Sequence, residues 1–265
     1  MNPYWLATFS LALALTNPPI TALTHNHPKA SLTPCRGFLF VQKHRTEILL
    51  AASRYEIPPV AVAGVIAAEF TLNRDLVDTM QDEWLTAQLA WHDEVWWTRW
   101  AQTRAQEAER DAAARLLGNK WSVSIIASGY VMSFGPAQIQ PKTAVRACSS
   151  SEAKEPICSS SIKALMTALL DDAMSIGLVA LIQRYEADLW ASERKTDVRQ
   201  NVAFLATLYS SGAEYRNATF SVRGHTPNRM GRWIEARTEV LSDLLDGRQL
   251  DGDTSAAKML CHTDK

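Results

Sequence analysis

Apolar residues recur at spacings of three and four along most of the chain, which is the period of an amphipathic helix. The spacing is clearest in residues 43–56, 59–69, 161–190, 198–210 and 228–246. Strictly alternating runs of valine, isoleucine and threonine, which are typical of strands, do not occur in the sequence. The pattern therefore predicts an all-α protein with short irregular links between its helices.

Proline and serine residues mark the starts of two predicted helices. Pro58 and Pro59 stand before the apolar run VAVAGVIAAEF, and the first turn of a helix tolerates proline. Ser159 to Ser161 stand before IKALMTALLDD and supply an N-cap. We expect the two helices to begin at these residues.

A tryptophan-rich stretch, residues 79–128, is also predicted to be helical, and it contains Trp84, Trp91, Trp96, Trp97, Trp100 and Trp121. Trp84 and Trp91 are seven residues apart and share one helix face, whereas Trp96 and Trp100 share another. Such a stripe favours packing in the core or between helices. A surface that faces a sugar, a membrane or a protein partner is the alternative.

Composition and charge narrow the class of partner. The chain has 265 residues, of which 47% are hydrophobic, so it can bury a large core. Its net charge is −1 and its acidic and basic residues are interspersed, which leaves no basic surface of the kind that binds DNA or RNA. We therefore expect no nucleic acid partner.

The N-terminus and the cysteines both predict export. Residues 1–24 carry no charged side chain and contain the apolar run Trp5 to Leu15, which is too short to span a bilayer but suits a signal peptide. A buried N-terminal helix is the alternative. We expect an exported protein, periplasmic or extracellular, whose membrane contact is limited to the signal segment.

Disulfides are the expected state of the four cysteines, because the sequence has no C-x-x-C pair and no histidine at the spacing of a metal ligand. Cys148 and Cys158 would close a short loop, and Cys35 and Cys261 would tie the two ends of the chain. Sequence alone leaves three pairings open, and four buried free thiols are the alternative.

One carboxylate stands at the end of an otherwise apolar helix. Residues 59–68 carry no charge, and Glu69 follows them. Burying a carboxylate is costly unless it is paired or protonated, and raising its pKa from about 4.3 to about 6 would cost roughly 2 kcal/mol. Such a shift produces a general acid at neutral pH. A glutamate that points at solvent is the alternative.

Other catalytic signatures are missing from the sequence, which contains no G-x-S-x-G, G-x-x-x-x-G-K-[ST] or H-E-x-x-H. Three segments instead resemble the lysozyme-like superfamily, and especially the bacterial lytic transglycosylases. They are YEIPPVAVAGVIAAEFTLN, SFGPAQIQPKTA and DVRQNVAFLATLYSSGAEYRNA, in the usual order, and with the links between them they cover roughly residues 55–220.

The resemblance implies a role for individual residues. Glu69 would be the catalytic acid and then the base. The residues expected to line the cleft are Ser133, Gly135, Gln138 and Ile139, together with Tyr209 and Gly212 of a Tyr-x-x-Gly turn whose tyrosine lies near the acid. The Gly135-Pro136 pair would turn the backbone sharply into the cleft, and Pro141 would restart a helix at its first position.

The implied reaction is cleavage of the β-1,4 bond between N-acetylmuramic acid and N-acetylglucosamine in the glycan strands of peptidoglycan, without metal or cofactor. A lytic transglycosylase needs one carboxylate and leaves a 1,6-anhydro end. A hydrolytic muramidase needs a second, for which Asp75, Asp78 and Asp82 are candidates. A peptidoglycan-binding or scaffold protein without activity, which could use the tryptophan-rich stretch as a partner surface, is the third alternative.

The chain departs from the family in two places. Phe70 and Thr71 follow Glu69, where a serine is common in the family, and the tryptophan-rich stretch delays the second motif. Phe70 could cover Glu69 or narrow the cleft.

The expected organisation is a signal peptide over 1–24, a helical segment over 25–54, a lysozyme-like domain over 55–246 with its insertion at about 79–128, and a tail over 247–265 that a disulfide could tie.

Overall fold

The computed structural model describes residues 36–73, 76–116, 132–150, 156–218 and 226–248. All of them belong to one compact unit, residues 33–265. The predicted signal segment, most of the predicted tail, Cys35, Asp75, Trp121 and Cys261 lie outside the described residues. Across the described ranges the secondary structure is helical without a strand, which confirms the all-α class.

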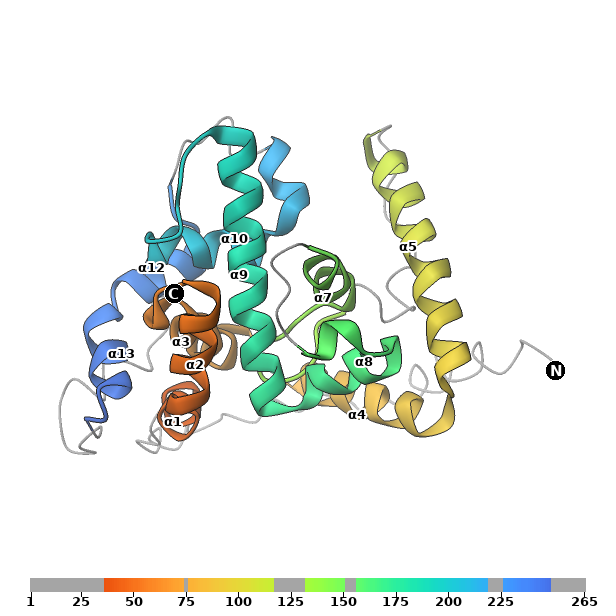
Figure 1. Cartoon of the computed structure of the whole chain (residues 1–265), viewed down its shortest axis with the longest axis horizontal. Helices are drawn as coiled ribbons and strands as arrows, with labels where there is room; N and C mark the ends of the chain where they lie inside the picture. Colours follow the sequence, from red (N-terminus) through yellow and green to blue (C-terminus); the bar gives the residue numbers. More distant parts are fainter. Residues whose placement is uncertain (1–35, 74–75, 117–131, 151–155, 219–225, 249–265) are drawn as a thin grey trace, which may run out of the picture. The chain divides into compact units, whose positions relative to one another are not determined.

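The elements of the described ranges are helices and helical turns (Figure 1). They are α1 (Arg36–Lys43), α2 (Arg45–Tyr55), α3 (Pro59–Ala68), the π-helical turn η2 (Glu69–Asn73), α4 (Leu76–Trp91), α5 (Glu94–Leu116), α7 (Pro141–Cys148), the 3₁₀ turn η3 (Pro156–Ser159), α8 (Ile162–Leu170), α9 (Asp172–Arg194), α10 (Val202–Ala218), α12 (Arg229–Glu235) and α13 (Thr238–Leu245).

Helix α3 is the centre of the core. Every residue from Ala61 to Ala68 is buried, and α1, α2, α9, α10, α12 and α13 all pack against this helix. A helix that is apolar on all sides has no solvent face, so it is stable only when neighbours surround it. Gly64 allows one of these neighbours to come close, because a Cβ atom at this position would meet the side chain of Ile234 on α12.

The predicted helix starts are confirmed. Helix α3 begins at Pro59 with Pro58 as its N-cap residue, and α7 begins at Pro141. The side chain of Ser161 caps α8 by accepting a hydrogen bond from the amide of Ala164 at 3.2 Å.

The prediction of one continuous helix over 161–190 is wrong. The chain leaves the helical conformation at Asp171, and α8 and α9 meet there at a bend of 105°. The side chain of Asp171 accepts a hydrogen bond from the amide of Met174 at 2.8 Å and so caps α9. The predicted helix over 228–246 is also two helices, α12 and α13, which are separated at Ala236 and Arg237.

No single described helix is both long enough and apolar enough to span a membrane, and the bent pair α8 and α9 passes that test only when its two helices are taken together.

The tryptophan-rich stretch forms two helices, α4 and α5, with a break at His92 and Asp93. Asp93 caps α5 by accepting a hydrogen bond from the amide of Trp96 at 2.8 Å. Lys163 joins the break between α4 and α5 to the start of α8. Its ammonium donates to the carbonyl of His92 at 2.7 Å, and its backbone amide donates to Glu94 Oε2 at 3.2 Å.

Most of the described tryptophans in this stretch serve packing, as predicted. Trp97 and Trp100 are buried, and Trp84 and Trp96 are half-buried against the core. Trp91 is the exception, because 85% of its surface is exposed.

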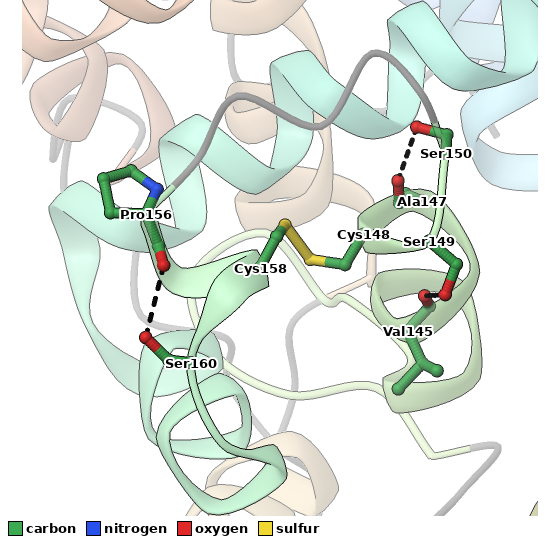
Figure 2. Close-up of a disulfide and its surroundings, with 8 residues drawn as sticks. All are labelled: Val145, Ala147, Cys148, Ser149, Ser150, Pro156, Cys158 and Ser160. Carbon is green, nitrogen blue, oxygen red and sulfur yellow. Dashed lines mark hydrogen bonds between the residues drawn. A yellow bond between two sulfur atoms is a disulfide. The ribbon is translucent and has the colours of Figure 1, made fainter.

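Cys148 and Cys158 form a disulfide, which settles one of the pairings that the sequence left open (Figure 2). The bridge joins the last residue of α7 to η3. A serine hydroxyl donates to a nearby backbone carbonyl on each side of the disulfide (Figure 2). Ser150 donates to Ala147 at 2.7 Å, and Ser160 donates to Pro156 at 3.2 Å. The end of α7 is thereby fixed to the segment that leads into α8.

Candidate active site

A pocket of about 390 Å³ lies where η2, α4, α7, α9, α10 and the segment 133–140 meet. Five of the residues that sequence analysis placed in the cleft line it, namely Glu69, Ser133, Gln138, Ile139 and Tyr209. The chain brings these residues together from three separate regions.

Glu69 lies at the junction between α3 and the π-helical turn η2. Its exposed fraction is 5%, so the alternative of a solvent-facing glutamate is wrong. The hydroxyl of Thr71 donates to the carbonyl of Ala67 at 2.7 Å within this turn. Single π-helical turns within helices are frequent at functional sites.

Phe70 does not line the pocket, so of the two effects considered for it, narrowing of the cleft is not observed. Its ring packs on the ring of Phe40 of α1 with a centroid distance of 4.9 Å. This aromatic contact joins the turn that follows Glu69 to the N-terminal helices.

The segment 133–140 is a tight backbone turn. Phe134 and Ile139 exchange two backbone hydrogen bonds of 3.1 and 3.0 Å, and the side-chain amide of Gln138 donates to the carbonyl of Gly135 at 3.1 Å. Gly135 has a φ of 72°, and a Cβ atom there would collide with the carbonyl of Leu169. Only glycine can adopt this backbone conformation and also lie so close to another backbone carbonyl.

Gly135 therefore shapes the turn and does not line the pocket itself. Its amide donates to Asp82 Oδ1 of α4 at 2.7 Å. This contact changes the role that we expected for Asp82, because its carboxylate anchors the turn and does not line the pocket as a second catalytic group. Asp78, one helical turn earlier, does line the pocket and is 8% exposed.

Tyr209 joins the turn to α10, because its hydroxyl donates to the carbonyl of Ala137 at 2.7 Å. Burial raises the pKa of the Tyr209 phenol well above its ordinary value, and the negative charge of Glu69 raises it further. The tyrosine and the glutamate are thus electrostatic neighbours, as the family resemblance implied.

The prediction of a turn at the Tyr-x-x-Gly sequence is wrong. Gly212 lies within α10, which continues to Ala218. A single glycine costs a helix only about 1 kcal/mol relative to alanine, and the residues that follow it can continue the hydrogen-bond ladder.

Sequence analysis missed a third buried carboxylate in the pocket, Glu186 of α9, which is 2% exposed. A different sequence signal points to this residue, namely its place on a buried helix stripe. Gln183 and Glu186 are three residues apart, and they fall on the same stripe of α9 as the buried residues Ile176 and Val179. A carboxylate on a buried helix stripe is therefore a second sequence signal for a pocket group.

The pocket offers proton donors and acceptors together with hydrogen-bonding groups, which suits a polar, hydroxyl-rich ligand. Its three carboxylates are all buried, and Tyr185, Ser210, Ser211 and Gln140 supply further polar groups to its walls. Within the described ranges, no group of three or more His, Cys, Asp or Glu side chains is arranged to hold a metal ion.

No family model, curated protein or solved structure matches this chain. The fold and the site define it as an all-α protein with a pocket built around buried carboxylates. The lysozyme-like resemblance rests on the three sequence segments alone.

Proposed function

We propose that the protein cleaves the β-1,4 bond between N-acetylmuramic acid and N-acetylglucosamine in peptidoglycan, and that it acts as a lytic transglycosylase. The observation that carries this proposal is the position of Glu69, which is buried in a pocket shared with Gln138 and Tyr209. The three residues come from the three segments that resemble the family, and their convergence on one pocket supports a common role.

In this mechanism Glu69 acts twice. It first protonates the glycosidic oxygen, so that the bond to the leaving N-acetylglucosamine breaks. It then takes the proton of the C6 hydroxyl of N-acetylmuramic acid, whose oxygen attacks the anomeric carbon and closes a 1,6-anhydro ring. The nucleophile belongs to the substrate, so no second carboxylate is required.

Two further contacts support this role for Glu69. The hydrogen bond from Tyr209 to Ala137 holds the 133–140 turn against α10, and the contact from Asp82 to Gly135 holds it against α4. The pocket wall next to Glu69 is therefore fixed from two sides. A general acid needs such preorganised surroundings because proton transfer depends on the position of the sugar oxygen.

Hydrolysis is a second candidate, and a specific observation favours it. Asp78 and Glu186 line the same pocket as Glu69, and either carboxylate could act as the base that activates water in an inverting muramidase or as the nucleophile of a retaining one. A hydrolase would leave reducing ends, whereas a transglycosylase leaves anhydro ends.

Mass spectrometry of the products released from purified sacculi tests both candidates. We expect soluble muropeptides with anhydro ends from the wild-type chain. Glu69→Gln should lower the rate of release at least about 100-fold, because a positioned general acid contributes that much or more. Glu193→Gln, which changes an exposed glutamate at the far end of α9, serves as the matched control and should retain full activity.

The alternatives predict different results. Reducing ends that disappear in Glu186→Gln or Asp78→Asn would favour hydrolysis. Wild-type protein that sediments with sacculi and releases no product would favour the scaffold without activity. Circular dichroism of each variant checks that its helices are intact.

A further inference from the structure

Two positively charged side chains line the pocket, and both come from one helix. Lys142 and Arg146 of α7 line it together with Thr143. The two cations are four residues apart, so they lie on the same face of the helix, one turn above the other. Lys142 is half-buried and Arg146 is exposed.

The acidic groups of the pocket are buried much more deeply. Glu69, Asp78 and Glu186 are 5%, 8% and 2% exposed. The charges are therefore separated by depth, with the carboxylates in the interior and the guanidinium of Arg146 toward solvent. A ligand that fits this arrangement brings uncharged hydroxyl-bearing parts to the interior and an anionic group to the α7 side.

The α7 helix is a firm support for these cations. It packs against α8 and α9, and its final residue is held by the disulfide to Cys158 (Figure 2). Pro141 sets its first turn at the end of the 133–140 segment. A helix fixed at both ends loses little backbone entropy when a ligand binds to its side chains.

We propose that Arg146, supported by Lys142, forms a carboxylate-binding subsite that selects acidic glycans over neutral ones. The proposal rests on the proposed function, because the pocket must first accept a glycan. The carboxylate has two sources in this substrate class, the lactyl group of N-acetylmuramic acid and the stem peptide. The planar guanidinium of arginine suits either source because it can pair with both carboxylate oxygens.

Binding measurements with the full chain carrying Glu69→Gln test the subsite without turnover. Isothermal titration calorimetry is carried out with three soluble glycans: strands stripped of peptides, which carry a free lactyl carboxylate, the same strands with these groups converted to neutral methylamides, and strands that retain their stem peptides. We expect at least one carboxylate-bearing form to bind more tightly than the amide form. Raising the salt concentration should weaken that preference.

Replacing Arg146 by Gln should lower the affinity for the preferred acidic strand by up to about fivefold, the range of an exposed ion pair, and should leave the affinity for the amide form unchanged. Lys142→Gln should act in the same direction. Arg229→Gln, which changes an exposed arginine at the start of α12, is the control and should alter neither affinity. An effect on stripped strands identifies the lactyl carboxylate, and an effect confined to peptide-bearing strands identifies the stem peptide.

Equal weakening of the acidic and amide forms by Arg146→Gln, or no weakening of either, would overturn the subsite. This result is separable from the proposed function. Wild-type protein that cleaves sacculi while its Arg146→Gln form binds normally removes only the subsite. A charge-dependent affinity in a wild-type chain that releases no product removes only the catalytic proposal.

Discussion

At the scale of single residues, the pair formed by Tyr209 and Glu69 is the most informative feature of the pocket. The tyrosine hydroxyl donates to the carbonyl of Ala137, and its ring lies in the pocket wall. Ionising this phenol would place a second negative charge near that of Glu69. The pair therefore makes a spectroscopic test of the pocket possible without a substrate.

Alkaline titration of the tyrosines, followed by phenolate absorbance, tests the pKa of Tyr209. Burial and, to a smaller extent, the charge of Glu69 raise the pKa of Tyr209. In the folded state, wild-type and Tyr209→Phe chains should therefore show the same phenolate absorbance across the range in which an ordinary tyrosine ionises, about pH 10, whereas in denaturant they should differ by one tyrosine. A native-state difference of one tyrosine near the ordinary pKa would contradict the burial of this group.

The same shift predicts how stability depends on pH. Because the folded chain keeps the Tyr209 proton more tightly than the unfolded chain, this contribution to stability is complete below about pH 10 and is lost as the pH rises above it. The free energy of unfolding should fall more steeply above pH 10 in wild type than in Tyr209→Phe. Chemical denaturation at several pH values measures the difference, and parallel curves would count against it.

At the scale of elements, the turn over residues 133–140 connects the pocket to α4, α8 and α10. Gly135 is its critical position, since a positive φ and contact with the carbonyl of Leu169 occur at the same residue. Asp82 then fixes the turn by accepting its amide. Changes in this turn should affect both stability and the position of Gln138.

Gly135→Ala should lower the free energy of unfolding by more than about 2 kcal/mol, because backbone strain and a collision with backbone atoms add together. Gly247→Ala is the matched control. Gly247 also has a positive φ, 88°, but a Cβ atom there would only touch the guanidinium of Arg45 at 3.6 Å. This control should cost about 1 kcal/mol from strain alone. Urea unfolding compares the two, and equal losses would show that the close approach to Leu169 has no consequence.

At the scale of the whole molecule, the pocket depends on contacts between distant parts of the chain. The contact from Asp82 to Gly135 spans 53 residues, and that from Tyr209 to Ala137 spans 72. The disulfide adds a covalent constraint across 10 residues and fixes α7, which carries the cations of the pocket. Stability and site geometry should therefore respond together when this constraint is removed.

Replacing both Cys148 and Cys158 by Ser should lower the free energy of unfolding by about 3 kcal/mol, since the unfolded chain regains the entropy of an open loop. Thermal or urea unfolding measures the loss. Peptide mapping without reduction should recover the fragment that contains Cys148 joined to the one that contains Cys158. A fragment that joins Cys148 to Cys35 or Cys261 would contradict the observed pairing.

The amino-acid pattern by itself determined the helical class, the starts of α3, α7 and α8, and the presence of a carboxylate at the end of an apolar helix. These features depend on local chemistry. Proline at a first helical turn, serine at an N-cap and apolar residues at spacings of three and four act on their immediate neighbours, whatever the rest of the chain does.

Only the tertiary structure decided which polar groups share the pocket. Asp82 and Asp78 are one helical turn apart in sequence, yet Asp82 anchors a turn by accepting the amide of Gly135, whereas Asp78 lines the pocket. Glu186 lines the pocket because of the way α9 packs. Asp171 separates α8 from α9 because its side chain caps α9. Such outcomes depend on contacts between residues far apart in the chain, and spacing along the sequence does not report them.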